Sequence, residues 1–396
     1  MTTSDTPDGE APRAIELDLM VELDSEGRSV GVERETPNDE VIEEPFDPEE
    51  IDVATRTPTI DLLLSRLRRG GLDLQPDFQR LAGIWKPQAQ SRLIESMLLR
   101  IPLPTFYASE VADEQWVVVD GIQRLTAIAR FISPESIPAE APLTLTGLEY
   151  LRQYDGKRFD QLPGRLQTRL LETEVVLHLI RSGTPEQVMF NIFARINTGG
   201  RPLTRQELRH ALLPGPARDL LRRLAESNAY RGATLGTVSP ARMDDREMVL
   251  RFLAFRMTSP STYRRQDFDE FLREAMHNIN QLDDGHIDRL EVDFIRAMHW
   301  AQRIFGEHAF RKYHYGQTRR SPINKALFEA ISVNLAQLDN HALRTLSTRR
   351  ELILNEISTL LDHVPFDRAI SVGTGDVAKV HMRFAEIENM LTRCSQ

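Results

Sequence analysis

The sequence predicts an α+β domain followed by an all-helical domain. Before residue 214, two β-prone runs, residues 115–119 and 172–180, alternate with segments of helical periodicity, the order expected of an α+β domain. After Leu213-Pro214-Gly215-Pro216 the apolar spacing is helical only. We therefore expect three parts: an acidic tail over residues 1–50, an α+β domain over 51–214 and a helical domain over 215–396.

Composition sets limits on the class of protein. The chain has 396 residues, 41% of them hydrophobic, which suits folded domains. Its one cysteine, Cys394, excludes a disulfide framework and cysteine-based zinc or iron–sulfur sites. No apolar run has the length of a membrane span, and residues 1–10 lack the pattern of a signal peptide. We expect a cytoplasmic protein without zinc, haem or iron–sulfur groups and without membrane contact.

The net charge of -10 is concentrated in the tail. Residues 1–50 carry 17 acidic residues and 3 arginines, so the remaining chain is mildly basic. The tail has few aromatic residues and cannot bury enough apolar surface to offset its ordering entropy. We expect it to be largely disordered. The alternative is an arm that mimics DNA or inhibits the protein by lying on a basic surface.

The α+β domain begins with helical patterns. Residues 57–69 place apolar side chains on one face, with Thr57 or Thr59 as the cap, and residues 88–100 repeat the pattern. An extended piece, TFYASE, follows Pro104. Each β-prone run then leads into a helix, and the second of these helices spans 184–196. For the helical domain the spacing predicts segments at 216–227, 243–258, 264–280, 288–306, 322–337, 341–362 and 376–393.

The most informative stretch joins a strand to a helix through Asp120 and Gly121. Glycine permits a tight turn, and the helix that follows presents free N–H groups and the positive end of its dipole. Arg124 lies in the first turn and can bind a phosphate, while Gln123 can orient water. Asp120 can hold Mg²⁺ or a ribose hydroxyl. The pattern suits an anion site, but a capped turn with a surface ion pair explains the same residues.

Two further stretches flank this turn. Upstream, the stretch with Gln79 and Arg80, followed by Trp85, adds two basic residues and an aromatic one. Downstream, Asn197 and Gly199 are typical of the end of a helix. Thr204 and Glu207 then have the spacing of a capping box that begins the next helix.

Together the three stretches resemble one family, the N-terminal domain of GmrSD-type modification-dependent restriction endonucleases (domain of unknown function 262). The family pattern reads P-x-F-Q-R…W, then V-D-G-Q-Q-R-L-T, then F-x-R-I-N-x-G-G-x-P-L-T-x-x-E-L-R. This chain has QPDFQR…IW at 75–85, VVDGIQRLTAI at 118–128 and FARINTGGRPLTRQELR at 193–209. Three ordered motifs over about 150 residues are far more specific than any one of them.

The resemblance implies a ParB/sulfiredoxin-like fold that binds a nucleoside triphosphate with Mg²⁺ at the strand–turn–helix. Carried over by position, it implies catalytic roles for Asp120 and Gln123, with Asp120 also as the Mg²⁺ ligand. It implies support from the 197–207 loop. Nucleotide or phosphate binding would fall to Gly121, Arg124, Thr126, Gln79 and Arg80, and loop support to Asn197, Gly199 and Glu207.

Position 122 departs from the family pattern. The first Gln of the motif is Ile122 here, which removes a polar group and affects hydrolysis more than binding. The same residue excludes sulfiredoxin chemistry, because that reaction needs a cysteine in this loop.

No complete nuclease motif accompanies these stretches. His308 and His314 with Asn324 come nearest to an HNH-type set, but the His-Ile-x-Pro core is absent. Asp155-Gly156-Lys157 is typical of a turn and not of a nuclease strand. A weaker signal for nucleic-acid binding is a basic cluster interleaved with Tyr313 and Tyr315, formed by Arg311, Lys312, Arg319 and Arg320.

The leading hypothesis is a nucleotide-binding regulator, with NTP hydrolysis as a further step, in DNA-related (anti-phage) defence. DNA and a separate nuclease subunit are the partners it would need besides the nucleotide. One alternative is a non-enzymatic module that binds DNA or a partner nuclease. The other is an Mg²⁺-dependent nuclease with unfamiliar catalytic residues. The sequence does not fix the oligomeric state.

Overall fold

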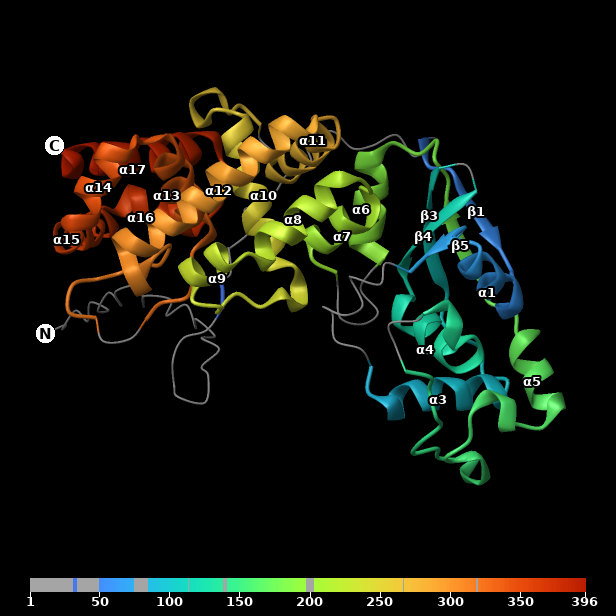
Figure 1. The fold of residues 1–396 in the computed structure, drawn as a ribbon. Helices are drawn as coiled ribbons and strands as arrows, with labels where there is room; N and C mark the ends of the chain where they lie inside the picture. The colour runs from blue at the N-terminus through green and yellow to red at the C-terminus, as the bar shows by residue number, and fades with distance from the viewer. Residues whose placement is uncertain are drawn as a thin grey trace, which may run out of the picture.

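The fold is a mixed α+β arrangement followed by a helical region, as predicted (Figure 1). The computed structural model describes residues 31–33, 50–74, 85–112, 114–137, 141–196, 203–265, 267–317 and 320–396. The finer expectation of a ParB/sulfiredoxin-like fold stays a prediction.

The described residues form one five-stranded sheet in the order β1-β5-β3-β4-β2. Strand β3 pairs antiparallel with β4 and parallel with β5, while β1 is antiparallel to β5 and β2 is parallel to β4. The strands are β1 (Val53–Arg56), β2 (Leu72–Asp73), β3 (Phe106–Ala112), β4 (Gln115–Asp120) and β5 (Leu177–Ile180). The run 115–119 is therefore a strand, the run 172–180 forms a strand only over its last four residues, and the extended piece TFYASE overlaps β3. The edge strands β1 and β2 were not predicted, because neither shows alternation.

One face of the sheet is covered by four helices. They are α1 (Ile60–Arg68), α3 (Pro87–Leu98), α4 (Ile122–Ile132) and α5 (Gly164–Leu171); in Figure 1, α3 and α4 lie below the sheet and α1 and α5 toward its right. Thr59 caps α1 by accepting from the Leu62 N–H at 3.3 Å, which decides between the two predicted caps. Phe106, Val118 and Leu177 from the sheet pack in the same buried cluster as these helices.

The other face of the sheet meets the helices that follow β5. These are α6 (Glu186–Ile196) and α7 (Arg205–Leu212). Val119 of β4 and Ile180 of β5 belong to the same hydrophobic cluster as the helical region. The predicted boundary at residue 214 falls between α7 and α8, yet buried residues from both sides share this cluster. The domain division itself stays a prediction.

The helical region contains ten α-helices within the residues that the structure describes. They are α8 (Pro216–Glu226), α9 (Asn228–Thr234), α10 (Asp244–Met257), α11 (Phe268–Asn280), α12 (Asp284–Phe305), α13 (Lys325–Gln337), α14 (Asn340–Thr348), α15 (Arg350–Leu361), α16 (Val364–Ser371) and α17 (Val377–Ser395). The predicted segment 341–362 is two helices that meet at Arg349. The short helices α9 and α16 were missed, since seven or eight residues carry little periodicity. Short 3-10 turns span Pro134–Ser136, Arg152–Tyr154, Phe159–Gln161, Pro240–Arg242, Pro260–Thr262 and Gly306–His308.

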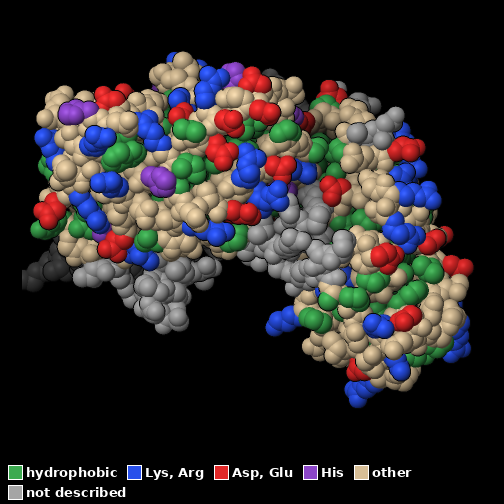
Figure 2. Space-filling model, viewed as in Figure 1, with side chains coloured by type: hydrophobic (Ala, Val, Ile, Leu, Met, Phe, Trp, Pro, Cys, Tyr) green, Lys and Arg blue, Asp and Glu red, His purple; other side chains and the backbone are tan. Residues whose placement is uncertain are grey.

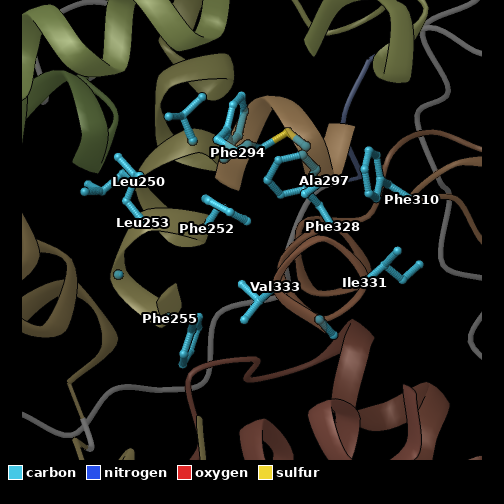
Figure 3. Close-up of a cluster of buried hydrophobic side chains, with 14 of the residues drawn as sticks. Leu250, Phe252, Leu253, Phe255, Phe294, Ala297, Phe310, Phe328, Ile331 and Val333 are labelled. Atoms are coloured by element: carbon cyan, nitrogen blue, oxygen red, sulfur yellow. The ribbon is translucent and has the colours of Figure 1, made fainter. Parts of the chain in front are cut away.

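Aromatic side chains from α10, α12 and α13 and from the segment between α12 and α13 fill the middle of the helical region (Figure 3). The rings of Phe252 on α10 and Phe294 on α12 lie 5.1 Å apart, edge to face. Phe310 and Phe328 make a similar pair at 4.7 Å. Edge-to-face pairs add about 0.5–1.5 kcal/mol each to the burial of their area. No helix among the described residues is long and apolar enough to cross a bilayer.

A buried chain of ion pairs runs through this region. Arg209 on α7 contacts Glu247 on α10 at 3.6 Å and also Asp269 on α11. Glu247 in turn pairs with Arg251 at 2.8 Å and with Lys325 of α13 at 3.2 Å. Burial alone would raise the pKa of Glu247, but Lys325, Arg251 and Arg209 hold it well below its usual range. The charged first turn of α10 is therefore largely internal.

Replacing Arg209 by Met should lower the free energy of unfolding by about 3–5 kcal/mol, because it removes one of the buried cations that balance the carboxylates of Glu247 and Asp269. Arg209 is only 1% exposed. The matched control is Arg393→Met on α17, which breaks an exposed pair with Glu356 and should cost less than about 1 kcal/mol. Urea unfolding of both variants measures the difference. Equal losses would contradict the structural role given to Arg209.

Asp245 generates a pH-dependent prediction. Burial raises its pKa to about 6, so the folded protein binds a proton here that the unfolded chain has released, and stability falls as the pH rises toward 6. Asp245→Asn removes this pH-dependent contribution to the free energy of unfolding. The stability of the variant relative to wild type should rise by about 1.4 kcal/mol between pH 5 and pH 7.5. Unfolding at both pH values measures it, with the exposed Asp288→Asn as background. A pH-independent difference would refute the prediction.

Candidate functional site

The turn between β4 and α4 requires glycine for two reasons. Gly121 has a φ of 96°, in the left-handed region, and forms the N-cap of α4. A Cβ at this position would lie 2.4 Å from Cδ1 of Phe106 on β3. No side chain caps the helix start. The first N–H groups of α4 therefore begin directly behind a turn that is packed against β3.

A β-bulge at the end of β4 sets the direction of Asp120. Tyr107 of β3 is opposite Asp120, whereas Ala108 is opposite Val118, so Val119 is the additional residue. Bulges redirect side chains at the ends of strands. Here the carboxylate of Asp120 meets the guanidinium of Arg124, with 2.9 Å between Oδ2 and Nη2, and its side chain is 36% exposed.

Arg124 is held in place by the protein itself. Nη2 donates to the Thr105 carbonyl at 3.1 Å, Nη1 donates to the Pro104 carbonyl, and the guanidinium lies 4.5 Å from the centre of the Phe106 ring. Its side chain is 11% exposed. Burial lowers the pKa of Arg124, and Asp120 opposes that shift. Arg124 therefore fixes the turn to the segment that leads into β3.

The remaining residues of the first turn of α4 have different surroundings. Ile122 is 5% exposed and belongs to the core of the sheet domain, so the departure from the family pattern is a buried apolar side chain. Thr126 is also buried, and its hydroxyl donates to the Ile122 carbonyl at 2.7 Å. Gln123 is half-buried, and its Oε1 accepts from the Trp85 N–H at 3.2 Å.

The Trp85 contact brings the first motif to this turn. The Gln90 side chain on α3 donates to the Trp85 carbonyl at 2.7 Å, and Arg130 of α4 donates to Gln90 at 3.0 Å. The end of the first motif is therefore fixed to α3 and α4 by hydrogen bonds. Gln79 and Arg80, which were predicted to bind phosphate, lie outside the described residues.

The end of the third motif is held in place by hydrogen bonds and ion pairs. The predicted capping box is confirmed: Thr204 N–H donates to Glu207 at 2.6 Å and Glu207 N–H donates to the Thr204 hydroxyl at 3.1 Å. Glu207 also pairs with Arg242 at 3.1 Å, and Arg209 begins the buried ion pairs described above. Helix α7 contacts β4, the strand that carries Asp120. Asn197 and Gly199 lie outside the described residues.

The predicted nucleic-acid cluster is mostly internal. Arg311 is 2% exposed and donates to the Ser321 carbonyl at 2.6 Å and to the Thr237 hydroxyl at 2.8 Å. Lys312 pairs with Asp367 at 3.3 Å, and Arg320 lies 3.9 Å from Glu307. Arg319 lies outside the described residues. Lys and Arg alternate with Asp and Glu over the face of the helical region shown in Figure 2.

Sequence reasoning missed a polar row beside the turn. His178 of β5 lies between Thr55 of β1 and Tyr107 of β3, with 2.9 Å from Nδ1 to the Thr55 hydroxyl and 5.1 Å between the two rings. Tyr107 is in turn opposite Asp120. His178 lies in a β-prone run and Tyr107 in the extended piece, but their contacts with each other and with Thr55 depend on strand order. Within the described residues, no group of three or more His, Cys, Asp or Glu is arranged to hold a metal ion.

The chain was compared with known proteins. Residues 60–214 match the family model described as GmrSD restriction endonuclease, N-terminal domain. The resemblance predicted from the three motifs is therefore confirmed over this segment. No curated protein and no solved structure matched the chain.

Gly121→Ala should destabilise the protein by more than its left-handed φ alone would cost. Gly156 is the matched control: its φ is +77°, but a Cβ there meets nothing within 4 Å. We expect Gly156→Ala to cost about 1 kcal/mol and Gly121→Ala at least about 1–2 kcal/mol more, because Phe106 must move. Urea unfolding measures both. Equal effects would show that the contact with Phe106 has no energetic weight.

Proposed function

We propose that the 60–214 segment binds the phosphates of a nucleoside triphosphate at the start of α4 and regulates a DNA-restriction process. The observation that carries the proposal is the uncapped helix start behind Gly121. Backbone N–H groups and the helix dipole favour an anion there. The family match supports the biological setting, because the description of the family names a restriction endonuclease. A role on DNA in restriction is a cytoplasmic one.

In this proposal Arg124 acts from its fixed position. Its guanidinium is bound to Asp120 and to the carbonyls of Pro104 and Thr105, so it contributes positive potential without moving toward the ligand. Preorganised charge of this kind costs no rearrangement when a phosphate arrives. Thr126 is excluded from direct contact by its burial, and the proposal gives it a supporting role in α4.

Gln123 and Asp120 are the polar side chains that remain available for chemistry at the turn. Gln123 is half-buried next to Trp85, where its amide could orient a water toward a phosphate. Asp120 is one-third exposed, and Oδ2 is in the ion pair. A single carboxylate suits Mg²⁺ that is carried mainly by phosphate oxygens, which is the usual mode for this ion. The Mg²⁺ would shield charge on the nucleotide.

Gln123→Glu tests the phosphate site in a way that separates binding from folding. A negative charge in the first turn of α4 interacts favourably with the positive end of the helix dipole. The variant should therefore unfold at the wild-type temperature or above. The same charge repels phosphate, so the affinity for nucleoside triphosphate with Mg²⁺ should fall at least about tenfold. Calorimetry with ATP, GTP and CTP measures the affinity.

Gln153→Glu is the matched control. Gln153 is exposed on the 3-10 turn Arg152–Tyr154, and the same change of charge there should leave the affinity unchanged. Failure of all three nucleotides to bind the wild-type protein would overturn the proposal. A loss of affinity equal in both variants would assign the effect to overall charge and not to the turn.

A further inference from the structure

A three-residue segment of the acidic tail lies on the helical region as an added strand. Val32 forms a parallel bridge with Ile323, the Glu33 N–H donates to the Ile323 carbonyl at 2.7 Å, and the Ile323 N–H donates to the Gly31 carbonyl at 3.0 Å. Ile323 also bridges Arg311 on its other side. The tail segment therefore extends a small backbone ladder, and it is drawn in blue near α9 in Figure 1. Edge pairing of this kind is a common way to bind extended peptides.

The side chains of the tail segment also have partners at this position. Both carboxylate oxygens of Glu33 are bound: Lys312 lies 3.0 Å from Oε1, and the Asn324 side-chain amide donates to Oε2 at 2.9 Å. The Glu33 side chain is 13% exposed. Val32 is partly buried and packs against the large hydrophobic cluster. One apolar and one acidic side chain thus accompany the backbone pairing.

The receiving residues are held by bonds that do not involve the tail. Asn324 caps α13 by accepting from the Leu327 N–H at 2.8 Å and donates to the Ile370 carbonyl at 2.7 Å. Lys312 donates to the Ser371 hydroxyl of α16 at 2.7 Å. A site whose donors are already in place loses little entropy when an acidic peptide binds.

We propose that residues 310–312 and 322–324, with the C-terminal end of α16, form a docking site for an extended acidic peptide, and that Gly31–Glu33 of the same chain occupies it. The charge complementarity of Glu33 with Lys312 and the ladder at Ile323 define the occupant. Covalent attachment gives the tail an effective local concentration of roughly millimolar, so it holds the site against weaker acidic peptides. This inference does not depend on nucleotide binding.

A labelled peptide with the sequence of residues 27–38 tests the site in full-length protein. We expect weak binding to wild type and at least about tenfold tighter binding to a Val32→Gly/Glu33→Ala chain, whose own tail no longer competes. Adding Lys312→Met to that chain should reduce the peptide affinity about tenfold or more. Glu35→Ala, a charge change in the same tail, is the control and should behave as wild type. A peptide that binds the Val32→Gly/Glu33→Ala chain no better than wild type would overturn the proposal.

Amide hydrogen exchange, measured together with the oligomeric state, gives a second test of the docking. In the wild-type monomer the amides of Glu33 and Ile323 should exchange more slowly than in an unstructured peptide, and Glu33→Ala should remove the protection at residue 33 while the helices stay protected. Exchange of the Glu33 amide at the unstructured rate in wild type would refute the docking. Protection that is found only in a dimer, and lost on dilution, would mean that the tail of a second copy occupies the site and would refute the same-chain assignment.

Discussion

A buried guanidinium joins the two halves of this molecule. Arg209 closes the third sequence motif, and it contacts carboxylates of α10 and α11, both in the helical region. A charge that is 1% exposed is costly unless it is paired, and the carboxylates that it contacts lose part of their charge balance without it. The motif and the helical region thus depend on each other for their charge balance. The position of α7, and with it the packing against β4, follows from this pairing.

The elements of the fold were largely predictable because their signals are local. The run 115–119 became β4, and the second half of the run 172–180 became β5. Most long helices began or ended near a cap or a proline, as Thr59 and Thr204 illustrate. The edge strand Val53–Arg56 was not predictable, since its only partner is β5, more than 120 residues away. The same applies to the docked Gly31–Glu33 segment. Pairing between distant segments leaves no periodic pattern in either of them.

The position of the candidate site was predictable from the sequence, but the bonding partners of its charged side chains were not. The strand–glycine–helix order identified the turn, and the left-handed φ of Gly121 agrees with the choice of residue. An arginine in a first helical turn looks the same in the sequence whether its side chain faces a ligand or bonds to the chain's own backbone. Arg124 and Arg311 both proved to be bound internally to carbonyl oxygens, because nearby loops supplied acceptors that only the folded chain brings close. Burial of a long cation is decided by such partners and not by its neighbours in sequence.

Strand β4 links the Asp120–Gly121 turn to the helical region through the packing of its side chains. Val119, the bulge residue next to Asp120, packs in the large hydrophobic cluster, while Gly121 is packed against Phe106 in the smaller one. A ligand that displaced the turn would therefore disturb both clusters, and packed interiors resist continuous deformation. The turn is accordingly rigid, as the proposed phosphate site requires. Arg124 is likewise fixed to Thr105, and under the proposed function this fixed position would supply electrostatic preorganisation.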